Sequence, residues 1–315
     1  MPRCSAFEFD DVSVSEPTEF ELYYRSGNHE YRYALSVHAD EIVYEGLWRR
    51  KLGASRSAML FEREGVEIKL GPTLRKLATA ATFNPSLPYL SFLCINFDAP
   101  VVKEAASWFL NGVFLNYNCS FLERALEQIL DEADSPEITR FLSAVDVRID
   151  GFRVEKASEG RNRRVFVRHN VGGKHYELRL PEESAGTQKL LGLAAFLLMA
   201  FNRGATVVVD ELDAKLHPKL LRYVILLFKD PEVNKSGAQL IFSSQDVSTM
   251  RNDVFRRDEI WFAARGEGEA SQLWSLADIH EANGNLVSRN AAFDKQYLSG
   301  RYGADPYLTR IEEWD

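Results

Sequence analysis

The sequence predicts an α/β protein, and three features of the chain carry that prediction. Residues 18–70 alternate apolar and polar side chains, as strands of an antiparallel sheet do. An apolar pattern of helical period runs from Leu190 to Leu198. The short apolar run 206–209 then ends in Asp210 and Glu211, which is typical of a buried parallel strand that delivers carboxylates to the rim of a sheet.

Composition agrees with this class. The chain has 315 residues, of which 45% are hydrophobic and 27% charged, enough for one large or two small cores. Its net charge of −8 argues against a dedicated nucleic-acid coat or an anionic-membrane binder, although local patches leave DNA open as a partner. Cys4, Cys94 and Cys119 show no paired or metal-like spacing, and no run approaches eighteen apolar residues. We therefore expect a cytoplasmic protein without a membrane segment.

We expect three parts along the chain. Residues 1–72 form an antiparallel β lobe, in which Phe20, Leu22 and Tyr24 stand two apart. Residues 73–145 form a helical insertion, whose apolar positions include Trp108, Phe109, Leu110, Val113, Phe114, Phe121, Leu122, Ala125, Leu126, Ile129 and Leu130. No sustained heptads follow, so we expect no long coiled coil.

Residues 146–315 form the third part, which we expect to hold the site. Strands are predicted over 145–152 and 164–180, followed by a helix to about 202. A strand over 205–210, a helix over 217–229 and a strand over 238–243 come next, and a last strand covers 258–263.

Two polar segments at the ends of these elements point to phosphate chemistry. Ser184, Gly186 and Thr187 stand where the apolar helix begins, and free backbone N–H groups and the helix dipole favour an anion there. Asp210 offers oxygen ligands to Mg²⁺, while Glu211 is placed to polarise an attacking water. Together they predict half of an ATP-hydrolysing site.

The same segments carry a family resemblance. Residues 183–187 match the E-S-x-G-T segment that serves as the ABC signature in one group of bacterial ATPases, and residues 207–211 match its Walker B strand and catalytic glutamate. Asp213 matches the D-loop, 216–218 match an L-H-P that opens the next helix, and 238–246 match the last core strand and switch loop. The chain resembles AAA-type ATPases built like ABC and SMC heads, specifically the overcoming-lysogenization-defect and abortive-infection branch.

The resemblance implies a P-loop NTPase head with a mixed sheet, using ATP and Mg²⁺. It also implies a homodimer that sandwiches ATP head to tail, with Ser184 and Gly186 of one protomer facing the phosphate held by the other. A nuclease or toxin effector in phage defence is the implied partner. Gln245 stands where the family usually carries His, so this switch can donate a hydrogen bond but cannot change charge.

One expected motif is absent from the sequence. A P-loop needs G-x-x-x-x-G-K-[ST], and no segment satisfies this pattern. The Gly173-Lys174 pair has Arg168 in place of the first glycine and His175 in place of the hydroxyl residue, and it lies between two strand patterns, which predicts a β-hairpin turn. Because the family's P-loop precedes a segment like 7–10, we expect the first strand, P-loop and first helix to be missing and the isolated chain to hydrolyse ATP hardly at all.

Two alternatives stay open at this point. In the first alternative, the chain is a non-catalytic subunit that keeps an ATPase fold and presents its signature face to an intact partner. Otherwise Asp210, Glu211 and Asp213 form a two-metal nuclease site, a hypothesis that leaves the Ser184–Thr187 segment unexplained.

Overall fold

The computed structural model describes residues 6–77, 83–116, 135–145, 147, 149–156, 163–266, 268–281 and 284–304. The chain divides into two compact units, residues 1–111 with 265–271 and residues 112–264 with 272–315. Helices and strands alternate in the second unit and an antiparallel sheet fills the first, which confirms the predicted α/β class. The expected apolar helix over 121–130 and Cys119 lie outside the described residues.

The first unit contains a five-stranded antiparallel meander in the order β1-β2-β3-β4-β5. Its strands are β1 (Thr18–Ser26), β2 (His29–His38), β3 (Glu41–Lys51), β4 (Ala58–Glu64) and β5 (Glu67–Leu70). Gly27 adopts a φ of 53° in the tight turn between β1 and β2, a conformation that glycine adopts without steric cost. The meander predicted over 18–70 is confirmed.

Two helices complete the core of this unit. They are α1 (Tyr89–Asn96) and α2 (Pro100–Asn111), preceded by 3₁₀ turns at Ser13–Ser15 and Arg75–Leu77. Leu93 and Ala105 are fully buried against aromatic side chains of the sheet, and the Tyr24 hydroxyl donates to the Ala105 carbonyl at 2.7 Å. Residues 89–111 of the predicted helical segment therefore pack on the β lobe.

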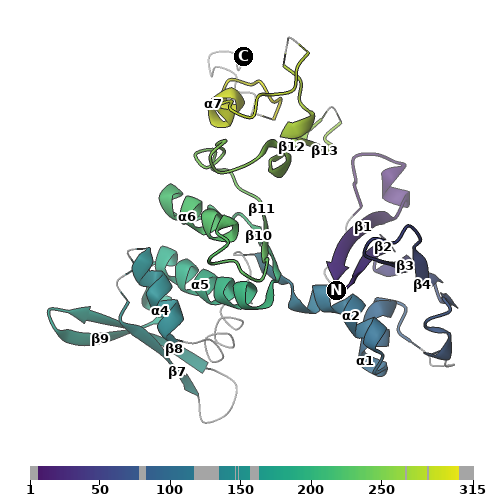
Figure 1. Cartoon of the computed structure of the whole chain (residues 1–315), viewed down its shortest axis with the longest axis horizontal. Coiled ribbons are helices and arrows are strands. Elements are labelled where there is room, and N and C mark those ends of the chain that lie inside the picture. Colours follow the sequence, from purple (N-terminus) through teal and green to yellow (C-terminus); the bar gives the residue numbers. More distant parts are fainter. Residues whose placement is uncertain are drawn as a thin grey trace. The chain divides into compact units, whose positions relative to one another are not determined.

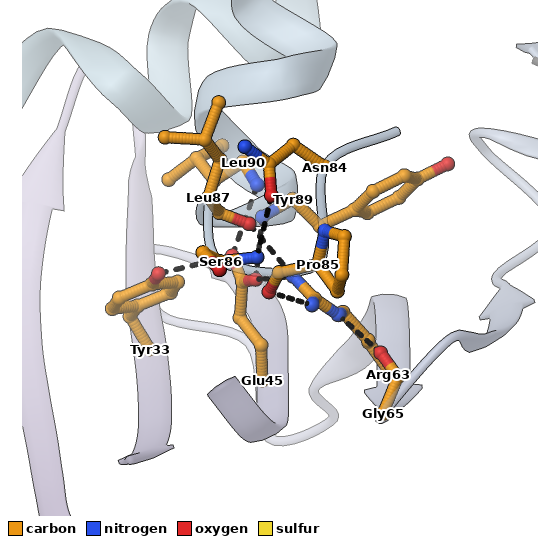
Figure 2. A network of polar contacts seen from close by, with 10 residues as sticks. All are labelled: Tyr33, Glu45, Arg63, Gly65, Asn84, Pro85, Ser86, Leu87, Tyr89 and Leu90. Carbon is orange, nitrogen blue, oxygen red and sulfur yellow. Dashed lines mark hydrogen bonds and ion pairs between the residues drawn. The ribbon is translucent and has the colours of Figure 1, made fainter. Parts of the chain in front are cut away.

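A buried ion pair joins the sheet to α1 (Figure 2). Glu45 on β3 and Arg63 on β4 both have fully buried side chains, 3.4 Å apart. The Glu45 carboxylate accepts from the backbone N–H groups of Tyr89 and Leu90 at 2.5 and 2.9 Å, and from the Tyr33 hydroxyl at 3.0 Å. Since the N-cap residue of α1 makes no side-chain cap bond, Glu45 supplies the missing acceptors from a distant strand.

Arg63 also donates hydrogen bonds to backbone carbonyls. It donates to the carbonyl oxygens of Gly65, Pro85 and Leu87 at 2.7, 2.5 and 2.8 Å (Figure 2). Burial raises the pKa of Glu45, while the donors that surround the carboxylate act in the opposite direction. The pair thus fixes the segment 83–88 against the sheet.

The second unit is built around a three-stranded parallel sheet in the order β11-β10-β6. The strands are β6 (Val113–Asn116), β10 (Thr206–Asp210) and β11 (Gln239–Phe242). One face is covered by α5 (Ala185–Arg203) and α6 (Pro218–Lys229), and the shared core includes Val113, Val207, Leu193, Leu197 and Leu221. The expected strand and helix positions over 184–243 are confirmed to within two residues.

Val113 and Phe114 form part of β6 rather than a helix, which corrects the expectation for these two positions of the segment 73–145. They pair with Val207 and Val208 in a parallel ladder, so tertiary pairing overrides the local helical pattern. On the face of the sheet away from α5 and α6, the Phe114 and Ile241 side chains are 60% and 58% exposed. Both lie beside Val208 in register.

An antiparallel hairpin layer adjoins α5 in this unit. It consists of β7 (Gly151–Lys156), β8 (Arg163–Val171) and β9 (Lys174–Arg179), together with α4 (Ser135–Ala144), which packs along α5 (Figure 1). The turn at Gly172-Gly173 has φ of 60° and 82°, so the predicted hairpin is confirmed. The strand expected from 145 begins only at Gly151, because the N–H groups of Val145 and Val147 both bond to the Leu142 carbonyl in a turn after α4.

The C-terminal part has its own small core. It contains β12 (Trp261–Arg265), β13 (Ser271–Ser275) and α7 (Phe293–Leu298), with 3₁₀ turns at Arg257–Glu259 and Leu276–Asp278. A further 3₁₀ turn, Leu180–Glu182, lies between β9 and α5. Phe262, Leu276 and Phe293 are buried in the C-terminal core. The strand expected from 258 begins three residues later, because Glu259 bonds back to the Arg256 N–H and closes a turn. No helix among the described residues is long and apolar enough to cross a membrane.

Candidate functional site

Ser184 begins α5 as its N-cap residue. Its side-chain oxygen accepts from the Thr187 N–H at 3.1 Å and lies 2.8 Å from the Thr187 hydroxyl. Ser184 is exposed, so this hydroxyl pair faces solvent at the positive end of a nineteen-residue helix. The preceding Glu183 is anchored, because its carboxylate is 7% exposed and lies 2.6 Å from Nε2 of His169 on β8.

The loop after β10 packs closely against this helix start. A Cβ atom placed on Gly186 would lie 3.4 Å from the Lys215 carbonyl oxygen, in van der Waals contact with the loop backbone. Both Glu211 and Lys215 adopt positive φ, 54° and 61°, which is uncommon for residues other than glycine. These two positions turn the chain sharply within the five residues that follow the strand.

Lys189 ties the helix to that loop. The residue is 3% exposed, and its ammonium donates to the carbonyl oxygens of Glu211 at 3.2 Å, Leu212 at 2.9 Å and Ala214. Burial lowers the pKa of Lys189 to about 8, with Asp213 and Glu211 acting in the opposite direction and Lys215 in the same direction. The helix that begins at Ser184 and the loop that carries Glu211 are thus parts of one structural unit.

Ser243, directly after β11, organises the two carboxylate residues at the end of β10. Its hydroxyl donates to Oδ1 of Asp210 at 2.6 Å and accepts from the Glu211 N–H at 2.8 Å. The backbone of Ser243 adds two bonds, since its N–H donates to the Val209 carbonyl at 3.1 Å and its carbonyl accepts from the Leu212 N–H at 3.0 Å. The backbone around Glu211, with its positive φ, is therefore held by four hydrogen bonds from Ser243, one of them to Glu211 itself.

Asp213 and Gln245 meet through the backbone. The Gln245 N–H lies 3.3 Å from each carboxylate oxygen of Asp213, and the Gln245 residue itself is exposed. The Asp213 carbonyl accepts from the Leu216 N–H at 2.9 Å. The structure thus joins the predicted D-loop residue to the predicted switch loop.

The predicted site residues therefore lie on two adjoining features of the second unit. Asp210, Glu211, Asp213 and Gln245 gather at the carboxyl ends of β10 and β11. Ser184, Gly186 and Thr187 lie at the start of α5, which Lys189 and Gly186 connect to the same loop. Within the described ranges, no three acidic, histidine or cysteine side chains are arranged to hold a metal ion among themselves.

Sequence reasoning missed two residues of this arrangement. Lys189 was not predicted because a lysine in an apolar helical pattern normally extends its ammonium to solvent. Its burial is explained only by the carbonyl partners that lie more than twenty residues later in the chain. Ser243 stands next to Ser244 at the end of a predicted strand, and nothing local distinguishes the two. The signal that could have pointed to Ser243 was its position directly after a predicted parallel strand, because residues at the ends of neighbouring parallel strands meet at one edge of the sheet.

Comparison with known families gives the class of the protein. The family described as "AAA domain, putative AbiEii toxin, Type IV TA system" matches residues 5–251, a span that contains both the Ser184 segment and the loop after β10. Since the match covers most of the 315 residues, the chain belongs to this family of AAA ATPase domains. A search of curated proteins found no match.

Solved structures similar to this chain include heads of SMC ATPases. The SMC head domain from Thermotoga maritima is 13% identical, with 79% of this chain and 74% of that chain covered and a TM-score of 0.34. An Smc head from Pyrococcus furiosus bound to the C-terminal domain of ScpA is 13% identical, with 79% and 77% covered and a TM-score of 0.36. A structure described for ATP-driven dimerization and DNA-stimulated activation of SMC ATPases is 17% identical, with 48% and 85% covered and a TM-score of 0.34.

Proposed function

We propose that the chain is an ATP-binding and ATP-hydrolysing head, in which the loop after β10 acts on its own ATP and the start of α5 faces the ATP held by a partner protomer. One observation carries the proposal: Lys189 of α5 holds the backbone carbonyls of Glu211, Leu212 and Ala214, so that the helix start and the acidic loop are positioned together. Membership of the AAA domain family supports ATP as the substrate.

Each residue then has a defined task. Asp210 would hold Mg²⁺, because its carboxylate is exposed at the strand end and one oxygen is already oriented by the Ser243 hydroxyl, leaving oxygen lone pairs that suit this cation. Bound there, Mg²⁺ neutralises phosphate charge. Glu211 polarises the attacking water, with its backbone fixed by Ser243. Gln245 donates a hydrogen bond near the γ-phosphate.

The exposed start of α5 acts in a partner protomer's site. Ser184, Gly186 and Thr187 offer hydroxyl and backbone donors at the positive end of the helix, directed at solvent. In a head-to-tail dimer they would contact the phosphates held by the other copy, with Asp213 beside them at the seam. The resemblance to abortive-infection ATPases suggests a nuclease or toxin as effector in phage defence, with DNA as an open partner.

The phosphate cradle is the remaining part of the proposed site. No P-loop motif is found in the 315 residues, so we propose that the cradle is supplied by another polypeptide segment, in cis or in trans. The chain alone should then hydrolyse ATP very slowly, because positioning and charge neutralisation by that loop contribute most of the catalysis.

The experiment compares the chain alone with the chain supplied with a P-loop segment, in cis or by co-expression. Phosphate release measures hydrolysis and light scattering measures dimerisation, each with and without ATP and Mg²⁺. Glu211→Gln should keep binding and trap the ATP dimer, Ser184→Arg should block dimerisation, and Asp210→Ala should weaken the Mg²⁺-dependent part of binding. The exposed Glu232→Gln serves as the charge-matched control.

Three outcomes contradict parts of the proposal. Dimerisation of Ser184→Arg equal to that of the parent excludes the head-to-tail arrangement. Fast turnover by the chain alone, abolished by Glu211→Gln, keeps the ATPase but excludes a cradle supplied from elsewhere. Cleavage of DNA with Mg²⁺ and without ATP replaces the ATPase by a nuclease.

A further inference from the structure

A polar pocket lies in the second unit, at the start of α6 and the segment that follows the switch loop. It has a volume of about 350 Å³. Its lining contains three cations, one carboxylate and two hydroxyl groups, contributed by Lys219, Arg222, Arg251, Asp253, Ser248 and Thr249. None of these residues belongs to the ATP-facing set described above, so the inference does not rest on the proposed function.

The two arginines are held in place by the carboxylate between them. Arg222 donates to Asp253 Oδ2 at 3.1 Å, and Arg251 donates through Nε to Asp253 Oδ1 at 3.1 Å. These contacts use only part of each guanidinium, which carries five N–H donors. The remaining donors are therefore available, and the contacts to Asp253 place both guanidinium groups on the same carboxylate.

The segment that carries Arg251 is itself rigid. The backbone N–H of Arg251 donates to the Thr249 carbonyl at 2.8 Å, and the Arg251 carbonyl accepts from the N–H groups of Val254 and Phe255 at 3.0 and 2.8 Å. Val254 is 3% exposed and belongs to the core under the sheet, while Phe255 packs against that core. The backbone that carries Arg251 is thus held in place before a ligand binds, which reduces the entropy that a ligand must overcome on binding.

We propose that this pocket binds a phosphate group. Three cations against one carboxylate leave an excess of two positive charges, which complements a phosphate of about −1.5 to −2 charge at neutral pH. Arg222 and Arg251 provide planar donors that fit phosphate oxygens, and Ser248 adds a hydroxyl donor. Lys219, for which no ion pair is found within the described part of the chain, adds a point charge at the first turn of α6.

Two sources present this chemistry, a free phosphate or pyrophosphate and the backbone of DNA. Calorimetry with inorganic phosphate and pyrophosphate tests the first source, and fluorescence anisotropy with a short labelled DNA duplex tests the second. Arg222→Gln, Arg251→Gln and Lys219→Gln should each weaken binding by about tenfold, as expected for the loss of one charge-assisted hydrogen bond. Lys235→Gln, which removes an exposed charge outside the pocket, is the matched control.

The salt dependence of binding distinguishes DNA from a free phosphate as the ligand. A DNA site should show salt dependence whose slope falls by about 0.9 for each phosphate contact removed, whereas the control leaves the slope close to that of the parent. Binding in the phosphate arm alone assigns the site to a free phosphate. Thermal unfolding of Lys219→Gln should match that of the parent, which distinguishes lost binding from lost folding. Absence of binding in both arms, or binding that the pocket variants weaken no more than Lys235→Gln, overturns the proposal.

Discussion

The ammonium of Lys189 lies 2.9 Å from the carbonyl oxygen of Leu212, although the two residues belong to a helix and to the loop after a strand. Two further carbonyls of the same loop accept from this ammonium, and the residue is 3% exposed. A buried cation of this kind is stable only when its donors are used, because burial without partners is costly. The contact therefore fixes where the acidic loop lies relative to the start of α5.

Replacing this cation should destabilise the loop. Lys189→Met keeps the volume of the stem but leaves the carbonyls of Glu211, Leu212 and Ala214 without their donor, so we expect the free energy of unfolding to fall by about 2–4 kcal/mol. Urea denaturation measures this change. Lys235→Met, at an exposed position, should change it by less than about 0.5 kcal/mol. Equal effects of the two substitutions would show that the Lys189 contacts contribute nothing.

The Glu45–Arg63 pair of the first unit should show strong energetic coupling. Glu45→Gln or Arg63→Met leaves one fully buried charge without its partner, and each should cost about 3–5 kcal/mol of folding free energy. The double variant should cost less than the sum, since it leaves neither charge uncompensated. A double-mutant cycle by chemical denaturation tests this, and strictly additive effects would exclude a coupled pair.

Gly204, which ends α5, should not tolerate a side chain. Its φ is 63°, and a Cβ atom would lie 2.4 Å from the Ser236 carbonyl oxygen, so Gly204→Ala combines backbone strain with a clash and should cost about 2 kcal/mol or more. Gly237 has a φ of 72° but open space around the Cβ position, so Gly237→Ala should cost only the strain, about 1 kcal/mol. Thermal unfolding of both variants gives the comparison. A smaller loss at Gly204 than at Gly237 would contradict the close approach.

The loss of folding stability at alkaline pH should depend in part on Tyr302. Burial raises the pKa of Tyr302 to about 12, and its hydroxyl donates to Gln296 Oε1 at 2.6 Å. Because the folded-state pKa lies above the unfolded value of 10, the folded protein holds the proton more tightly, and stability falls as pH rises from 10 to about 12. Tyr302→Phe should remove this part of the fall, at most about 2–3 kcal/mol, in denaturation measured across that range. Parallel pH profiles of the two proteins would exclude the shift.

Sequence patterns predicted most of the regular structure because local alternation and helical period survive in the folded chain. The meander over 18–70 and the order of helix and strand from Ser184 to Phe242 follow these periods. The errors fall where pairing or turns override local preference. Val113 and Phe114 form a strand because β10 offers them a ladder, and Trp261 begins a strand only after the turn closed by Glu259.

The sequence by itself determined which residues stand at the end of β10 and at the start of α5, since both are read from short segments next to clear periodic elements. Only the tertiary structure decided that Lys189 joins the two and that Ser243 orients Asp210 and Glu211. The same holds for Glu45, which caps α1 from a strand more than forty residues earlier in the chain. These contacts join residues far apart in sequence, and a buried polar group takes its partner from whatever the fold brings within hydrogen-bond distance, which no local pattern records.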